Sequence, residues 1–321
     1  MVGMTTRTSA IEVMGLCKSY GDREVVAGVD LTVPEGAVYA LLGPNGAGKT
    51  TTVRILSTLI PADAGEVRIA GYDVHREADQ VRASIGVTGQ FSAVDGLLTG
   101  RENLRLMADL GHLDRRRAKT VAEQLLERFD LVDAADRRAA TYSGGMKRRL
   151  DLAMTLVSGP RLIFLDEPTT GLDPRSRREL WGIVRELAAD GVTVFLTTQY
   201  LEEADRLADR IGVLDGGRLV AEGTAAELKR LVPGGRIELQ VADGERVAEL
   251  ARRLPGASPN ATALTVTLPH DGSLTTLRRL LDGIDDDAVI GLAVHTPDLD
   301  DVFLALTGHP TTDESPEEVP V

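Results

Sequence analysis

The sequence is poor in cysteine, in aromatic side chains and in long apolar runs. Among its 321 residues there is one cysteine, Cys17, which excludes an internal disulfide and a cysteine-cluster metal site and fits a reducing compartment. No apolar run reaches the roughly 18 residues of a membrane-spanning helix, and residues 1–10 lack the apolar core of a signal peptide. We therefore expect any membrane-spanning part of the system to be another polypeptide.

Positive charge is also in deficit. The chain has 36 Lys and Arg against 49 Asp and Glu, a net charge of −13, whereas a general nucleic-acid binder is normally basic. Short basic runs at 115–117, 147–149 and 175–178 are expected on solvated helix faces. The prediction is a protein without a nucleic-acid partner. Its 43% hydrophobic content is enough for a real core.

A complete glycine-rich phosphate loop stands near the start of the chain. It matches G-x-x-x-x-G-K-[ST] at every position and consists of Gly43, Pro44, Asn45, Gly46, Ala47, Gly48, Lys49 and Thr50. An apolar strand is predicted before it at 38–42 and a helix after it at 51–59, which is the context that this loop requires. We expect backbone N–H groups and Lys49 to hold phosphates, and Thr50 to place its hydroxyl on Mg²⁺.

The rest of the chain suggests a large α/β domain followed by a small one. Strand-like segments are predicted at 11–13, 25–33, 66–69, 162–165 and 192–196, with a hairpin over 211–221. Helical periodicity predicts a separate helical lobe over about 91–158.

Pro233-Gly234-Gly235 is the expected domain boundary. The prediction is a first domain at 1–232 and a small α+β accessory domain at 233–308, with strands at 236–241 and 264–268 and helices at 246–254 and 274–281. Asp298 is expected to cap a last helix. The acidic residues 309–321 are predicted to be a disordered tail.

A second motif gives the loop a family context. Tyr142-Ser143-Gly144-Gly145-Met146 is followed about twenty residues later by Leu162-Ile163-Phe164-Leu165-Asp166-Glu167. With the phosphate loop, this combination resembles the ATP-binding-cassette (ABC) ATPases. The resemblance implies an α/β P-loop ATPase core with an antiparallel β subdomain and an inserted helical lobe. It also implies a homodimer of ATP-binding subunits that closes on two ATP molecules and drives a separate transmembrane permease subunit from the cytoplasmic face of the cell membrane.

The resemblance assigns roles around the loop. Asp166 would hold the Mg²⁺ shell and Glu167 would polarise the attacking water, although an Asp-Glu pair alone could be a structural strand end. Gln90 resembles the glutamine that ligates Mg²⁺ and joins the core to the helical lobe; alone it would be an ordinary polar loop residue. Tyr20 would stack on adenine or else be a half-buried strand tyrosine. Thr51 completes the ATP-contacting loop.

Ser143, Gly144 and Gly145 precede a helix predicted from Met146 to about Val157 and would form a second anion site. In the family this site and the phosphate loop lie on opposite faces, so Ser143 and Gly145 would bind the γ-phosphate of the partner subunit's ATP. Asp173, in Gly171-Leu172-Asp173, resembles the loop that communicates across the dimer interface.

Two positions depart from the common family pattern. The signature lacks the usual leucine before Ser143 and the usual glutamine after Gly145. Gln199, in Thr197-Thr198-Gln199-Tyr200, stands where most ABC proteins have histidine. Glutamine exchanges hydrogen bonds but does not titrate near neutral pH. The hypothesis is that Gln199 positions the γ-phosphate and the water without acid–base work.

A narrower resemblance exists to the daunorubicin/doxorubicin-resistance type of ATP-binding subunit. It is carried by the segments 140–146, 196–205 and 299–306, and within this group the glutamine is the expected residue. It implies an exporter of drugs, antibiotics or lipid-like compounds. Two alternatives remain at this stage: a soluble ABC ATPase acting on DNA or the ribosome, and an importer motor with the same core chemistry.

Overall fold

The computed structural model describes residues 9–89, 92–232, 235–270, 274–282, 284, 289–295 and 297–308. The chain forms two compact units, of which the first runs to Ala225 and the second begins at Ala226. The sequence predicted the domain boundary at 232/233, and that position stays a prediction. None of the helices within the described ranges is long and apolar enough to cross a membrane.

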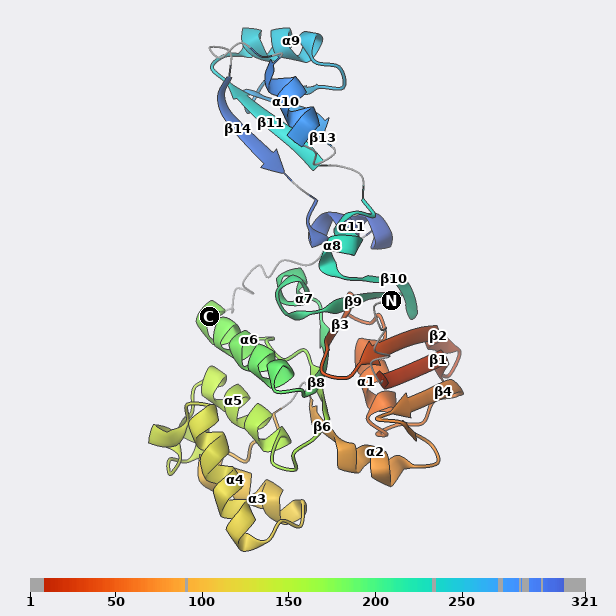
Figure 1. Ribbon diagram of the computed structural model, residues 1–321, viewed down its shortest axis with the longest axis vertical. Coiled ribbons are helices and arrows are strands. Elements are labelled where there is room, and N and C mark those ends of the chain that lie inside the picture. Colours follow the sequence, from red (N-terminus) through yellow and green to blue (C-terminus); the bar gives the residue numbers. More distant parts are fainter. Residues whose placement is uncertain are drawn as a thin grey trace, which may run out of the picture. The chain divides into compact units, whose positions relative to one another are not determined.

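A six-stranded sheet organises the first unit (Figure 1). Its order is β10 (Arg218–Gly223), β9 (Arg210–Asp215), β3 (Val38–Leu42), β8 (Thr193–Thr198), β7 (Leu162–Asp166) and β6 (Ile85–Thr88), parallel except for β10, which forms an antiparallel hairpin with β9. Every residue of β3, β7 and β8 is buried. This explains their nearly continuous apolar sequences, because a parallel sheet is covered on both faces.

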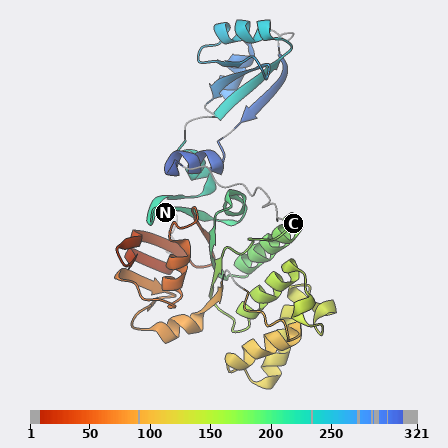
Figure 2. The ribbon, with the colours of Figure 1, turned by 180° about the vertical axis from the view of Figure 1, so that it is seen from behind.

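The two faces of this sheet are covered differently. On one side lie α1 (Lys49–Leu56) and a second, antiparallel sheet with the order β2 (Arg23–Pro34), β1 (Ser9–Tyr20), β4 (Ala64–Ile69) and β5 (Tyr72–Asp73). On the other side lies α6 (Pro174–Ala189), and α7 (Leu201–Leu207) follows β8 (Figures 1 and 2). The only tryptophan of the sequence, Trp181 on α6, is buried and donates its indole N–H to Oε1 of Glu203 at 3.0 Å.

The helical lobe lies between β6 and β7 in the sequence, after α2 (Ala78–Ser84). It consists of α3 (Gly100–Leu110), α4 (Arg115–Arg128) and α5 (Gly144–Thr155), with single turns of 3-10 helix at Val132–Ala134 and Ala139–Thr141. Thr99 and Glu102 form a capping box at α3, and Asp114 caps α4. These caps satisfy the first N–H groups of each helix and fix where the helices begin.

The second unit is a small α+β domain. After α8 (Ala225–Lys229), its sheet has the order β12 (Ser258–Asn260), β13 (Thr265–His270), β11 (Gly235–Val241) and β14 (Val289–His295), all antiparallel. The helices are α9 (Gly244–Arg253), α10 (Leu274–Asp282) and α11 (Leu299–Thr307). Buried leucine and valine side chains of β11, β13 and α9 form a core of their own.

Several elements differ from the sequence-based expectations. The helix after the phosphate loop begins at Lys49 and ends at Leu56, not over 51–59, because Thr58 has a left-handed φ of 62°. Strands β12 and β14 were not predicted. The cap at Asp298 is confirmed, as part of a capping box at α11. The predicted tail, residues 309–321, lies outside the described residues.

Candidate nucleotide-binding site

The phosphate loop joins β3 to α1 and packs tightly against neighbouring backbone. A Cβ on Gly43 would lie 2.3 Å from the carbonyl oxygen of Leu214, and one on Gly48 would lie 2.5 Å from that of Val25. Gly48 also has a φ of 107° and is the N-cap of α1 without any side-chain cap. Only glycine fits these positions, and the first N–H groups of α1 are left for a ligand, the arrangement that binds phosphate at helix N-termini.

Lys49 is the cation of this site. Its side chain is 4% exposed, and Nζ donates to the carbonyl oxygens of Gly43 at 2.8 Å and Pro44 at 3.1 Å. Nζ also lies 3.4 Å from Oε1 of Glu167. Burial lowers the pKa of Lys49, and the Glu167 carboxylate opposes that shift. A desolvated cation beside open N–H groups favours an anionic ligand.

Asp166 ties three elements together at the carboxyl end of β7. Its Oδ1 accepts hydrogen bonds from the hydroxyls of Thr50 on α1, at 3.2 Å, and Thr197 on β8, at 2.5 Å. Across the described ranges, no group of three or more His, Cys, Asp or Glu side chains is placed to hold a metal ion. One carboxylate and one hydroxyl nevertheless fit Mg²⁺, which takes most of its ligands from phosphate and water.

Glu167 is held in an uncommon backbone conformation. Its φ is +47°, and its N–H donates to both the carbonyl oxygen and Oγ1 of Thr197, at 3.2 and 3.1 Å. A non-glycine residue in this region costs about 1–2 kcal/mol. Such strain is retained where the surroundings fix it, and it concentrates at functional sites. A pocket at the loop is lined by Asn45, Gly46, Thr51 and Glu167, among other residues.

The second predicted anion site, at the start of α5, is exposed and already has a side-chain cap. Ser143 is the N-cap of α5, and its Oγ accepts a hydrogen bond from the N–H of Met146 at 3.2 Å. Ser143 and Gly144 are exposed. A Cβ on Gly145 would lie 2.5 Å from Oγ of Ser176 on α6, and that hydroxyl donates to Oδ2 of Asp173 at 2.6 Å.

The two anion sites are separate within one chain. In the described part of the chain, no hydrogen bond joins Ser143, Gly144 or Gly145 to the phosphate loop. Figure 1 shows α1 and α5 on opposite sides of the large sheet. Within a single chain, the two predicted anion sites therefore do not meet.

Three further residues were predicted for this site: Gln199, Tyr20 and Gln90. The structure describes the first two. Gln199 directly follows β8 and is half-buried; its neighbour Thr198 accepts the N–H of Gly43 through its carbonyl oxygen at 3.2 Å. Tyr20 ends β1, is 50% exposed, and has Nζ of Lys18 at 5.7 Å from its ring centroid. Gln90 lies outside the described residues.

The sequence analysis missed two residues of this region. Thr197 pairs in register with Asp166 across β7 and β8, and its signal was a hydroxyl at the end of an apolar strand. Arg148 contacts the backbone beside Glu167. No sequence signal distinguished it from the other basic residues of 147–149.

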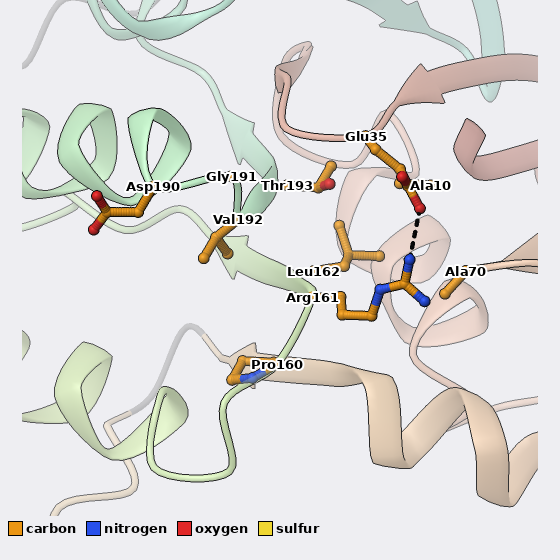
Figure 3. A pocket seen from close by; sticks show the side chains of 10 residues that line it. All are labelled: Ala10, Glu35, Ala70, Pro160, Arg161, Leu162, Asp190, Gly191, Val192 and Thr193. Atoms are coloured by element: carbon orange, nitrogen blue, oxygen red, sulfur yellow. Dashed lines mark hydrogen bonds and ion pairs between the residues drawn. The ribbon is translucent and has the colours of Figure 1, made fainter. Parts of the chain in front are cut away.

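Another pocket lies at the opposite ends of the strands (Figure 3). It is formed where β7 and β8 begin, and there Arg161 makes an ion pair with Glu35 at 2.9 Å. Ligands of open α/β sheets bind outside the carboxyl ends of the strands. The carboxyl ends carry the loop, Asp166 and Glu167, which makes that end of the sheet the candidate site for a nucleotide.

Known proteins resemble the chain in sequence and in fold. The family model "ABC transporter" matches residues 26–170. The daunorubicin resistance ATP-binding protein DrrA2 of Streptomyces coeruleorubidus is 51% identical over 99% of this chain and 99% of its own length. The Nod factor export ATP-binding protein I of Rhizobium meliloti is 39% identical over 95% of this chain and 90% of its own.

A solved dimeric ATP-binding cassette, in a post-hydrolysis state bound to ADP and Pi, superposes with a TM-score of 0.60 at 26% identity, covering 67% of this chain and 98% of that one. The loop geometry, the full-length similarity and the shared fold agree. The chain belongs to the ABC transporter family, as an ATP-hydrolysing, nucleotide-binding subunit of an exporter of the daunorubicin/doxorubicin-resistance type.

Proposed function

We propose that the chain binds ATP with Mg²⁺ at the phosphate loop and hydrolyses it in a homodimer to drive efflux through a separate membrane subunit. The observation that carries this proposal is the convergence of Lys49, Asp166 and Glu167 at one end of the sheet. The site there combines the buried cation of Lys49, the Asp166 carboxylate as a candidate metal ligand, and the Glu167 carboxylate on a strained backbone. All three lie beside the N–H groups of α1 that no side chain caps.

The nucleotide is held mainly by the loop. The N–H groups of the loop and of the first turn of α1 bind the β- and γ-phosphates, and Lys49 exchanges its carbonyl partners for phosphate oxygens. Thr51 adds a contact at the helix start, and Tyr20 stacks on the adenine. Thr50 and Asp166, with Gln90, would hold Mg²⁺, and the ion would supply positive charge that offsets the charge of the phosphates.

Glu167 is the residue proposed to orient and polarise the attacking water. Its oxygen Oε1 faces Lys49, and Thr170 donates to Oε2 at 3.4 Å. The N–H of Glu167, which donates to both the carbonyl oxygen and Oγ1 of Thr197, fixes the Cα of Glu167 relative to β8. The carboxylate is therefore presented from a rigid strand end, which favours a defined geometry for in-line attack.

The second half-site acts in trans. Ser143 accepts from Met146 through a lone pair, which leaves its own O–H free to donate to a phosphate oxygen. Ser143, Gly144 and Gly145 bind the γ-phosphate held by the partner subunit, and Asp173 lies at the same interface. The dimeric cassette bound to ADP and Pi supports this arrangement.

Gln199 is proposed to position the γ-phosphate and the water by hydrogen bonds alone. Gln199→Ala is expected to lose most of the ATPase activity while Gln199→His retains it, because both glutamine and histidine supply a donor and an acceptor. An active alanine variant would show that this position is dispensable.

The cargo is proposed from the relatives. Relatives that are 48–51% identical carry the name daunorubicin resistance, and one that is 39% identical carries the name Nod factor export. We propose a drug, an antibiotic or a lipid-like compound as the cargo, with this subunit bound peripherally at the cytoplasmic face of the membrane.

The test is ATP-dependent dimerisation of Glu167→Gln, measured by size-exclusion chromatography with light scattering. A dimer that forms only with ATP supports the two half-sites, and Glu167→Gln combined with Ser143→Asp should abolish it. A Glu167→Gln chain that does not bind ATP would overturn the site assignment. A wild-type level of hydrolysis by Glu167→Gln would overturn the role of Glu167.

A further inference from the structure

A buried arginine connects the helix of the second half-site to the turn that carries Glu167. Arg148 lies on α5, the helix that Ser143 caps, and its side chain is 11% exposed. Nε donates to the carbonyl oxygen of Pro168 at 2.7 Å, and Nη2 lies 3.4 Å from the carbonyl oxygens of Asp166 and Glu167. One guanidinium thus spans three consecutive peptide units at the end of β7.

Arg148 also reaches the end of β6. Its Nη1 donates to the carbonyl oxygen of Gly89 at 3.0 Å. Asp151, one turn further along α5 and 4% exposed, lies 3.3 Å from the same Nη1 and accepts the N–H of Ala93 at 3.0 Å. The pair therefore holds the chain on both sides of residues 90–91, which the structure does not describe.

Burying the charges of Arg148 and Asp151 at this position costs free energy, because both lose contact with water. Burial lowers the pKa of Arg148 and raises that of Asp151, and each partner opposes the shift of the other. A buried ion pair adds little to stability compared with apolar residues of the same volume. Five donors in a planar fork, however, fix the mutual positions of several carbonyl groups in a way that apolar packing does not.

We propose that Arg148, oriented by Asp151, is a positioning residue that links the start of α5 to Glu167, so that a phosphate of the partner subunit's ATP, seated on Ser143 and Gly145, fixes the place of the Glu167 carboxylate in the same chain as Arg148. This inference rests on the function proposed above. Ser143 caps the helix that carries Arg148, so a displacement of the first turn of α5 moves the guanidinium and the peptide units that it holds.

Arg149 provides a matched control. It is the next residue of α5, with a side chain 17% exposed, and its Nη1 donates to the carbonyl oxygen of Phe129 at 3.2 Å and lies 3.3 Å from Asp130. These partners belong to the helical lobe. Arg149→Lys therefore makes the same chemical change on the same helix, away from Glu167.

The experiment compares Arg148→Lys and Arg149→Lys in the full chain co-expressed with its membrane subunit. Lysine keeps the charge but cannot bond to Gly89 and Pro168 together. For Arg148→Lys we expect kcat for ATP hydrolysis to fall about tenfold or more with KM changed less than about twofold, because misplacement of a reacting group affects the chemical step. Arg149→Lys should leave both constants near wild type.

A double-mutant cycle with Ser143→Ala then tests the connection itself. If the effect of Ser143 passes through Arg148, the losses in kcat of the two single variants will not multiply in the double variant. Independent losses, equal effects of Arg148→Lys and Arg149→Lys, or a fall in kcat that follows only the thermal unfolding midpoint would overturn the inference. Lys49→Ala separates the proposals, because an active Lys49→Ala chain contradicts the proposed function itself.

Discussion

The two helix N-termini proposed to bind phosphate are built in opposite ways. At α1 the N-cap is Gly48, which has no side chain to satisfy the first N–H groups, and the neighbouring cation Lys49 is buried. At α5 the N-cap is Ser143, which satisfies the N–H of Met146 and is exposed. The first site has a buried charge and no cap, whereas the second is exposed and already capped.

Under the proposed function, this difference gives the two sites different roles in binding ATP. A buried cation binds an anion more strongly than an exposed one does, so α1 suits the capture of nucleotide by a single chain. An exposed hydroxyl that already accepts one hydrogen bond contributes little until a partner surface excludes water. We infer that the α1 site sets the affinity of a single chain for ATP. The α5 site would contact phosphate only after a second subunit has bound.

The largest change is expected on removing the cation of the α1 site. Lys49→Ala deletes the ammonium group that faces Glu167, and ATPase activity should fall by about 10²–10³-fold, the scale for losing one preorganised electrostatic contact. A fluorescent ATP analogue should also bind more weakly to the single chain. Equal affinity for the wild type and Lys49→Ala would remove the contrast between the two sites.

A smaller but more selective loss is expected at the α5 site. Ser143→Asp keeps a good N-cap and places a negative charge at a helix N-terminus, so the thermal unfolding midpoint should not fall. The carboxylate repels the partner's phosphate, and ATPase activity should drop by about 10²-fold while nucleotide binding by one chain is retained. Weakened binding by the single chain would show that the two sites are not separate.

Gly145→Ala is expected to have an intermediate effect through packing. The added Cβ meets Oγ of Ser176, so the first turns of α5 and α6 must separate. Overpacking of this kind costs about 1–3 kcal/mol, measurable by urea unfolding. Combination with Ser176→Gly should restore much of the free energy of unfolding. Absence of any rescue would place the cost of Gly145→Ala elsewhere.

The smallest effect concerns pH and belongs to the α1 site alone. Burial lowers the pKa of Lys49, and phosphate binds its charged form. ATP affinity should therefore decline as pH rises through this lowered pKa, before an ordinary lysine would lose its proton. Lys49→Arg keeps its charge throughout this range, so its affinity should be independent of pH there. Titration calorimetry between neutral and alkaline pH measures both.

The sequence was informative wherever chemistry requires particular residue types in a row. The phosphate loop and the Asp166 strand end were recognisable because their glycine, lysine and aspartate residues stand there for local chemical reasons. A helix after Ser143 was also predicted, but from Met146 to about Val157, whereas α5 runs from Gly144 to Thr155 with Ser143 as its N-cap. The hairpin over β9 and β10 was predicted from Gly216-Gly217, both of which have positive φ.

What could not be predicted depends on contacts between distant segments. Thr197 bonds to Asp166 across 31 positions of sequence, and Arg148 reaches Gly89 across 59. Neither partner is indicated by local periodicity. Strand β14 was missed because it is an edge strand with largely exposed side chains, so it lacks the simple alternation of buried and exposed residues that marks a half-buried strand.

Trp181 gives this protein a built-in optical reporter. It is the only indole in the sequence, and its N–H bonds to Glu203 on α7, directly after the segment that carries Gln199. Its own helix, α6, begins at the Asp173 cap. When tryptophan is excited selectively, the emission therefore comes from one place in the chain, the contact between α6 and α7. Stopped-flow emission from the unlabelled chain would therefore test whether ATP binding and the proposed subunit closure change the contact between Trp181 and Glu203.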